Sequence, residues 1–319
     1  MSRLGALALL ATLGAGCEPS AGPPPPAPSR LHVVASVYPV YEFARHVAGE
    51  AAEVALLIPP GVEPHDWEAS PKDVGRVADA RVFVHNGAGF EPWVDRLLAG
   101  LGDRRPAVVA AAAGLELLDA LPAADPHGHG HPPPRRERAA GPAPAKDPHV
   151  WLDPVLAAAQ VEAIRAGLAA ADPPNAARYA AGAEAFAARL RALHERFEQG
   201  LASCQRREIV VSHAAFTYPA RRYRLTQIPI TGAAPDAEPS PAELARIVRV
   251  ARRHRVSVVF FEPLVASRLA DALARELGAR TLPLNPIEGL TREEAARGTG
   301  YVALMEKNLA HLRDGLGCR

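Results

Sequence analysis

A run without proline occupies residues 175–203, after the pair Pro173-Pro174. Its apolar positions recur every three or four residues, which is the spacing of one helical face: Phe186, Leu190, Leu193, Phe197 and Leu201. At 1.5 Å per residue these 29 residues would extend about 43 Å. Gly182 costs some helical stability but does not end the pattern. The chain must therefore fold around one helix long enough to cross a whole domain.

Strand and helix patterns alternate on both sides of this long helix. Before it, the pattern predicts strands at 31–37, 53–58, 81–85 and 107–110, and helices at 38–49, 70–78, 90–99 and 154–170. After it, the pattern predicts strands at 208–211, 256–261 and 281–284, and helices at 241–254, 267–277 and 301–316. Such alternation with short connections is typical of a mostly parallel sheet flanked by helices. The predicted fold class is α/β, with two such lobes joined by one long, rigid backbone helix.

These elements divide the 319 residues into segments. The predicted order is a signal peptide at 1–17, a proline-rich tether at 18–30, an N-terminal lobe at 31–153, connecting helices at 154–203 and a C-terminal lobe at 204–319. The N-terminal lobe contains a polar tract rich in histidine and proline at residues 125–146. Each lobe has the size of an ordinary domain.

The first residues have the pattern of an export signal. Arg3 precedes an unbroken run of apolar and small residues from Leu4 to Gly16, which is too short to span a bilayer but suits a secretory signal core. The run ends at Cys17 and resembles a bacterial lipobox, with Gly14 at a position where Leu is usual. Lipidation of Cys17 and plain cleavage near Ala15 are both open. In either case we expect an exported protein of the periplasm or cell envelope, anchored by lipid in the first case.

The net charge bears on possible partners, and the remaining cysteines bear on a possible disulfide. The net charge is +1 and the basic residues are dispersed, so the sequence predicts no nucleic-acid partner. Cys204 and Cys318 remain in a chain that we expect to be exported. Such a pair favours a disulfide, which would tie the C-terminus to the middle of the chain. Two unrelated buried thiols are the alternative.

Three histidines occupy equivalent places in the predicted fold. His65 and His213 each follow a strand, and His149 lies four residues before a helix that begins at Asp153-Pro154, an N-cap followed by proline. Ligands of open α/β sheets bind beyond the carboxyl ends of the strands. Each histidine alone is more often structural, but three in equivalent places predict a metal site in the cleft between the lobes. Imidazole nitrogens suit Zn²⁺. The histidines within helical or strand patterns are interpreted as surface or packing residues.

The segments around these histidines resemble a known family. They are 61–68 (GVEPHDWE), 147–154 (DPHVWLDP), 212–218 (SHAAFTY), 261–263 (FEP) and 301–308 (YVALMEKN). The chain resembles the bacterial zinc/manganese solute-binding proteins of ABC transporters, of the high-affinity zinc-uptake (ZnuA-like) type. The resemblance implies two pseudo-symmetric lobes with a rigid linking helix, and a monomer that delivers metal to a membrane permease driven by a cytoplasmic ATPase.

The resemblance also bears on which metal is bound. Manganese-preferring relatives tend to have a carboxylate at the position of His213, and softer nitrogen ligands fit zinc better than manganese. We therefore expect Zn²⁺ as the transported ion, with Mn²⁺ as the alternative. The zinc branch often carries a histidine-rich loop, and here such a loop contains His127, His129 and His131. It is either an accessory zinc site or a linker whose histidines bind nothing.

The fourth ligand is open at this stage. Many relatives have an Asp where this chain has Asn285, and an amide oxygen is a weak, uncharged donor. We expect three histidines plus water, or plus a nearby carboxylate from Glu63 or Glu288. Asn285 is then at most a marginal ligand or a support for the other ligands.

Rival functions are disfavoured by the same residues. A zinc hydrolase would need a general base beside a zinc-bound water, for which Glu63 or Glu262 is available, but the sequence has no HExxH helix. Adhesion is compatible with a tethered N-terminus and is not required by any motif. An organic-solute carrier would need anchoring groups that the cleft segments lack. The prediction is a zinc carrier that is not an enzyme.

Overall fold

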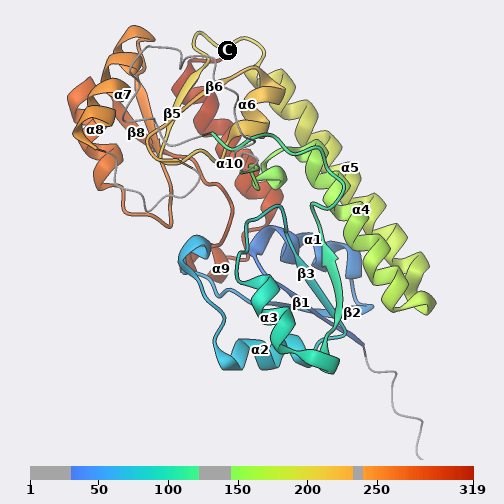
Figure 1. Cartoon of the computed structure of the whole chain (residues 1–319). Coiled ribbons are helices and arrows are strands. Elements are labelled where there is room, and N and C mark those ends of the chain that lie inside the picture. The colour runs from blue at the N-terminus through green and yellow to red at the C-terminus, as the bar shows by residue number, and fades with distance from the viewer. Residues whose placement is uncertain (1–29, 122–144, 233–239) are drawn as a thin grey trace, which may run out of the picture.

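The computed structural model describes residues 30–121, 145–232 and 240–319. The predicted signal peptide with Cys17, nearly all of the tether and the loop histidines His127, His129 and His131 lie outside the described residues. Two four-stranded sheets form the described fold, one in each lobe, and one of two long, paired helices runs along one side of both lobes (Figure 1). The predicted α/β class with two lobes is confirmed.

The N-terminal sheet has the strand order β2-β1-β3-β4, and all of its pairs are parallel. Its elements are β1 (Leu31–Ala35), α1 (Tyr38–Ala48), β2 (Ala52–Leu56), α2 (Pro71–Ala78), β3 (Val82–His85), α3 (Val94–Gly100) and β4 (Ala107–Ala110), with short 3-10 helices η1 (Pro64–Asp66) and η2 (Gly102–Arg104). The central strands are buried on both faces, as parallel sheets require. Their continuous apolar runs follow from this burial.

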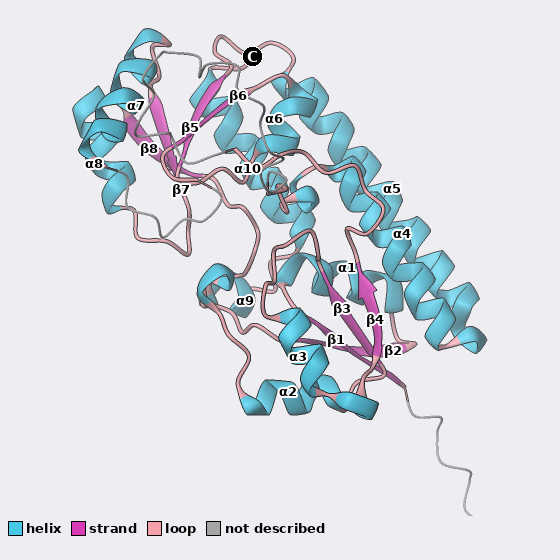
Figure 2. Cartoon of the chain, in the orientation of Figure 1, coloured by secondary structure: helices cyan, strands magenta, loops and turns pink. Residues whose placement is uncertain are grey.

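The C-terminal sheet repeats the topology with the order β6-β5-β7-β8, again entirely parallel. Its elements are β5 (Glu208–Val211), α6 (Thr217–Tyr223), β6 (Thr226–Pro229), α7 (Pro241–Arg253), β7 (Val258–Phe261), α8 (Arg268–Leu277), β8 (Arg280–Pro283), α9 (Arg292–Ala296) and α10 (Tyr301–Leu316). Figure 2 shows the two sheets well separated, with helices around each. The carboxyl ends of their strands carry the loops that lie between the lobes.

The connecting helices are α4 (Pro154–Ala171) and α5 (Ala176–Leu201), joined by the short turn η4 (Pro173–Asn175). With 26 residues, α5 extends about 39 Å. A Cβ on Gly182 would lie 2.5 Å from the carbonyl oxygen of Val47 in α1, and one on Gly200 would lie 3.1 Å from Leu309 in α10. The two glycines therefore let α5 pack closely against a helix of each lobe. Gly182 has a packing reason that outweighs its cost in helix propensity.

The structure adds elements that the sequence pattern did not predict. These are strand β6 and the short helices α6 and α9. Strand β6 has the sequence Thr-Gln-Ile-Pro, which offers one buried apolar residue and ends in proline, so it lacks the pattern of a buried strand. It is tolerated because it is an edge strand. The predicted start of the helix at Asp153-Pro154 is confirmed, since Asp153 accepts a hydrogen bond from the backbone N–H of Val155 at 2.9 Å.

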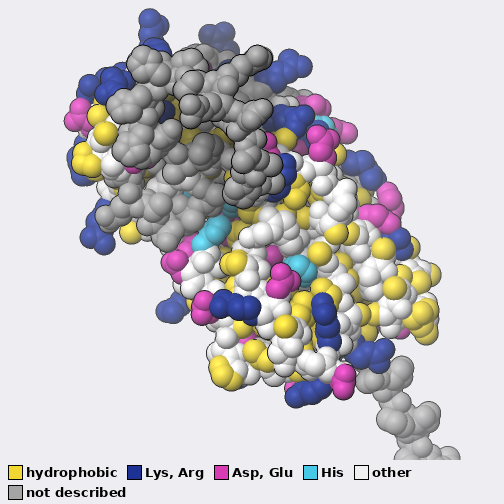
Figure 3. All heavy atoms as spheres, viewed as in Figure 1, with side chains coloured by type: hydrophobic (Ala, Val, Ile, Leu, Met, Phe, Trp, Pro, Cys, Tyr) yellow, Lys and Arg dark blue, Asp and Glu magenta, His cyan; other side chains and the backbone are white. Residues whose placement is uncertain are grey.

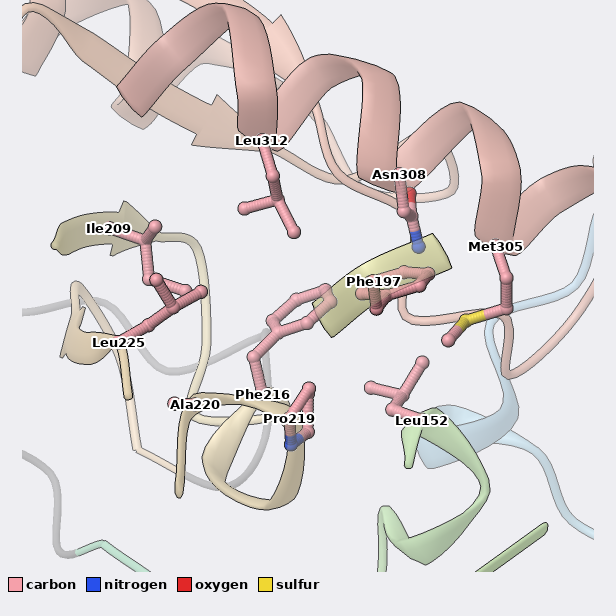
Figure 4. A pocket seen from close by; sticks show the side chains of 10 residues that line it. All are labelled: Leu152, Phe197, Ile209, Phe216, Pro219, Ala220, Leu225, Met305, Asn308 and Leu312. Atoms are coloured by element: carbon pink, nitrogen blue, oxygen red, sulfur yellow. The ribbon is translucent and has the colours of Figure 1, made fainter. Parts of the chain in front are cut away.

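A small apolar cavity of about 10 Å³ lies in the C-terminal lobe (Figure 4). Its walls come from α5, β5, α6 and α10 and from the turn that contains Leu152. The only polar side chain of its lining is Asn308, which is bonded to the backbone of Asn285.

On the surface, side chains of both charges are interspersed over the described part of the face in Figure 3. No described helix combines the length and the apolar character needed to cross a membrane.

Candidate metal centre

Four side chains from both lobes meet between the two sheets. His65 lies in η1 beyond β2, and His149 immediately precedes the 3-10 helix η3 (Val150–Leu152). His213 follows β5, and Glu288 lies in the loop beyond β8. One ligand atom from each lies within 4.8 Å of the others, and no other such group occurs in the described parts of the chain. The structure thus brings together the three predicted histidines, with Glu288 as the fourth member.

The geometry of this cluster matches that of a tetrahedral zinc site. Glu288 Oε1 lies 3.4 Å from His65 Nε2, 3.1 Å from His149 Nε2 and 3.2 Å from His213 Nε2. The Nε2 atoms of His149 and His213 are 3.4 Å apart. Zinc bonds of 2.0–2.1 Å in a tetrahedron give separations of about 3.3 Å between donor atoms. Both carboxylate oxygens of Glu288 and Nε2 of His65 are buried without a hydrogen-bond partner, so a cation would satisfy atoms that otherwise have none.

Two further carboxylates contact two of the imidazoles at Nδ1, the ring nitrogen that faces away from the cluster. Asp147 Oδ1 accepts the backbone N–H of His149 at 2.9 Å and lies 2.8 Å from its ring Nδ1. Glu262 Oε1 accepts the backbone N–H of His213 at 3.1 Å and lies 2.7 Å from its Nδ1. A carboxylate at Nδ1 keeps the proton on that nitrogen and leaves Nε2 free to bind metal. Both rings are therefore oriented for coordination in the same way.

The charges of the cluster shift its pKa values in opposite directions. Burial lowers the pKa of His149 and His213, but their carboxylate partners outweigh it and raise both values. Burial raises the pKa of Glu288, but the three surrounding histidines hold it well below the usual range. Burial and the neighbouring Glu288 raise the pKa of Glu63 to about 8. At neutral pH, Glu63 is consequently mostly protonated, while Glu288 is a carboxylate.

Only one member of the cluster contacts solvent to any extent. The side chains of His149 and His213 are 0% exposed and that of Glu288 is 1% exposed, whereas that of His65 is 14% exposed. The ring of Phe90 packs edge-on against His65, with centroids 4.9 Å apart. An ion can therefore reach the cluster from the side of His65.

Aromatic residues also brace the turns that carry the cluster. The indole N–H of Trp151 donates to the carbonyl of Pro286 at 2.7 Å, and the hydroxyl of Tyr301 donates to the carbonyl of Trp151. The first of these bonds links the turn of His149 to the loop of Glu288. The turns on the two sides of the cleft are thereby fixed to each other.

The remaining sequence candidates for the fourth ligand lie outside the cluster. Glu63 accepts the backbone N–H of His65 at 3.3 Å, and so supports the turn of His65. Asn285 Oδ1 accepts the backbone N–H of Ile287 at 2.7 Å, and its own backbone is paired with Asn308. Asn285 therefore shapes the loop that carries Glu288.

The sequence reasoning missed the roles of Asp147 and Glu262 as partners of the histidines. Asp147 lies two residues before His149 in a turn, and this spacing allows one carboxylate to reach both the backbone and the ring. Glu262 is 49 residues from His213 and meets it because β5 and β7 are neighbours in the sheet. The signal for Glu262 was its place directly after a predicted strand.

Cys204 and Cys318 are joined by a disulfide in the structure. Cys204 follows α5 and Cys318 follows α10, so the bond ties the ends of two helices together. It lies at the end of the C-terminal lobe near the C-terminus of the chain in Figure 1.

Two parallel sheets joined by a long helix, with a buried group of three histidines and a glutamate between them, define a metal-binding solute-binding protein. The family model described as ZnuA, zinc-uptake complex component A, periplasmic, matches residues 33–315. The chain belongs to this family, whose members are solute-binding components of transport systems and not a family of enzymes.

Individual relatives agree with this assignment. The high-affinity zinc uptake system protein ZnuA of Bacillus subtilis is 38% identical over 287 residues, which cover 90% of this chain and 88% of the relative. The zinc-binding lipoprotein AdcA of Streptococcus pneumoniae is also 38% identical, over 90% of this chain, but the chain spans only 56% of its length. The crystal structure of the Zn(II)-bound ZnuA-like domain of the latter protein superposes with a TM-score of 0.75 at 36% identity, covering 90% of this chain and 99% of that domain.

Proposed function

We propose that the protein captures Zn²⁺ between its lobes through the Nε2 atoms of His65, His149 and His213 and the carboxylate of Glu288. The observation that carries the proposal is the convergence of three Nε2 atoms on one buried carboxylate oxygen at 3.1–3.4 Å. Three nitrogens and one oxygen favour zinc over manganese, which prefers oxygen ligands. The names of the relatives, a zinc uptake protein and a zinc-binding lipoprotein, support the same ion.

The residues of the cleft have different roles in zinc binding. His149 and His213 lose protons as the ion binds, because only neutral imidazole coordinates metal. Asp147 and Glu262 keep those rings in the orientation that coordination requires. His65, which is partly exposed, meets the incoming ion first. Since α5 packs closely against a helix of each lobe, we expect binding to move loops and not to close a wide hinge.

The proposed cellular role is delivery of the captured zinc to a membrane permease driven by a cytoplasmic ATPase. Family membership and the export pattern of residues 1–17 support this role. We propose that the protein is a monomer in the periplasm or cell envelope, and that a lipid on Cys17 anchors it through the tether at residues 18–30. The name of the AdcA relative, a lipoprotein, supports this anchor.

Two other functions are less well supported. A zinc hydrolase needs an open coordination position for its water, whereas the four donors that lie within 4.8 Å of one another in this chain would fill a tetrahedral site. We therefore propose that the protein has no enzymatic activity. Adhesion is named for structural relatives such as the laminin-binding adhesin Lmb of Streptococcus agalactiae, at 30% identity. The zinc-named relatives reach 38% identity, which favours the carrier.

The test is metal titration of the purified, metal-stripped protein with Zn²⁺ and Mn²⁺ in competition. We expect one tight zinc site that is lost in His213→Ala and kept when residues 125–144 are deleted. Retention after the deletion would make the histidine-rich loop accessory. Preference for Mn²⁺ would overturn the assignment of the ion, and the absence of any tight site would overturn the carrier function.

A further inference from the structure

The surroundings of the metal centre carry more negative charge than coordination itself requires. Besides Glu288, the carboxylates of Asp147 and Glu262 lie one imidazole ring away from the converging Nε2 atoms. In each of them one oxygen contacts the histidine, while the other, Oδ2 of Asp147 or Oε2 of Glu262, is buried without a hydrogen-bond partner. No lysine or arginine is buried in the described parts of the chain. In the described residues these two carboxylates form ion pairs with His149 and His213 and with no lysine or arginine, so the positive charge that balances them lies in the cluster.

We propose that Asp147 and Glu262 determine which ionic charge the site accepts, favouring a divalent cation over a monovalent one with the same ligand preference. This inference rests on the proposed function, since it concerns the same site. The competing ion to be excluded is Cu⁺, because imidazole also suits copper and because Cu⁺, like Zn²⁺, has a filled d shell without a preferred geometry. Three of the four donors are imidazoles, which bind either ion, so charge is a second means of discrimination beside ligand type.

Electrostatics separates this role from the positioning of the rings. The interaction of an ion with a fixed carboxylate is proportional to the charge of the ion at a given distance. For binding to imidazoles that are already neutral, removal of one carboxylate charge should therefore change the logarithm of the affinity for Zn²⁺ twice as much as that for Cu⁺. Misorientation of an imidazole, in contrast, weakens a nitrogen bond to either ion. A loss of affinity on the logarithmic scale that is twice as large for Zn²⁺ as for Cu⁺ therefore indicates a charge effect. A loss that is equal for the two ions indicates a change in the position of the ring.

The experiment uses Asp147→Asn and Glu262→Gln, separately and together. Each amide keeps an oxygen that can accept the same N–H bonds and removes only the charge. Affinities for Zn²⁺ and for Cu⁺ are measured by competition with chelators at a pH at which His149 and His213 are neutral before the ion binds, the latter under anaerobic reducing conditions. Loss of such a partner typically weakens metal binding about 10–100-fold. We expect that loss for Zn²⁺ and roughly its square root, about 3–10-fold, for Cu⁺.

The matched control is Glu184→Gln on α5, which removes an exposed carboxylate paired with Arg191. It should change neither affinity. Equal losses of Zn²⁺ and Cu⁺ affinity in both amide variants would overturn the inference and leave a positioning role only, and unchanged affinities would overturn it as well. A wild-type protein without tight zinc binding would instead refute the proposed function, so the two failures are distinguishable. Circular dichroism of each metal-free variant checks its folding, and the two sites give independent tests.

Discussion

The two lobes share one sheet topology but use the ends of their central strands differently. In the C-terminal lobe, β5 and β7 are followed by His213 and Glu262, whose side chains meet at 2.7 Å. In the N-terminal lobe, β1 and β3 are followed by Ser36 and Asn86. Both bind Glu91, through the Ser36 hydroxyl at 2.6 Å and the Asn86 backbone at 2.7 Å. The strand ends of one lobe supply a ligand, His213, with the carboxylate that holds it, and those of the other lobe supply a support.

The support in the N-terminal lobe acts on the turn that carries His149. The Asn86 side chain donates to the carbonyl of Pro148 at 3.0 Å and accepts from Gln160 in α4 at 2.8 Å. The ligand of this lobe's own sheet, His65, comes instead from the loop beyond the edge strand β2. The same sheet topology therefore presents two kinds of ligand across the cleft. His213 of the C-terminal lobe is buried and held by a carboxylate, whereas His65 of the N-terminal lobe is partly exposed.

Substitution of His213 by alanine should produce the largest effect. If the free energy of zinc binding at a structural site, roughly 10–16 kcal/mol, is divided equally among four ligands, each contributes about 2.5–4 kcal/mol. His65→Ala should cost less, because its side chain is 14% exposed and water can take its place. Chelator competition on both variants measures the difference. Equal decreases in zinc affinity in the two variants would show that the two histidines contribute equally to binding, and would contradict the difference between the lobes.

Removal of the disulfide tests whether the stability of the C-terminal lobe can be lowered without a change in zinc affinity. The bond closes a loop with a sequence separation of 114 residues. Cys204→Ser combined with Cys318→Ser should lower the free energy of unfolding by about 2–4 kcal/mol. Zinc affinity should not change, because neither cysteine touches the cluster. Urea unfolding of the double variant and of the reduced wild-type protein should agree. A parallel loss of zinc affinity would contradict the separation.

The pH dependence should show that the two carboxylate-held imidazoles behave alike. The pKa of His149 and His213 is lowered by burial but raised overall by Asp147, Glu262 and Glu288. Because zinc displaces these protons, its affinity should rise with pH, by about 1.4 kcal/mol per pH unit for each proton, until the pH exceeds the raised pKa values of the two rings.

The stability of the metal-free protein should move in the opposite direction. A raised pKa in the folded state gives a contribution that is complete below about pH 6.5 and is lost as the pH rises through the folded values. Zinc titrations and unfolding of the metal-free protein between pH 6 and 8.5 measure both trends. A zinc affinity independent of pH would rule out protons on these rings.

Much of this arrangement could be predicted from local sequence patterns. The alternation of strands and helices indicated two parallel sheets, and loops beyond strands indicated His65 and His213. Those signals are local, because a strand end and its following loop are adjacent in sequence. Strand β6 was not predictable in this way, since its edge position removes the need for an apolar run.

The partners of the ligands were harder to predict for a physical reason. Glu262 meets His213 across 49 residues, and Asn86 meets Pro148 across 62. Such contacts depend on the order of strands in the sheet, which no local pattern specifies. Glu288 was one of several open carboxylates, because the path of the loop after β8 decides which one enters the cluster. That path depends on Asn285 and Asn308, which are bonded across 23 residues.

Substitution of Asn86 by alanine should produce the smallest of these effects and tests the support directly. The variant leaves the carbonyl of Pro148 and the amide of Gln160 buried without their partners, which costs about 1–3 kcal/mol of stability. Because the turn of His149 loses one of its anchors, zinc affinity should fall only a few-fold, or about 1 kcal/mol. The control Asn175→Ala removes an amide that binds Asp172 at the start of α5. It should leave zinc binding unchanged. If Asn86→Ala lowered stability and left zinc affinity equal to that of the control, the N-terminal strand ends would support the fold alone, and Asp147 would suffice to orient His149.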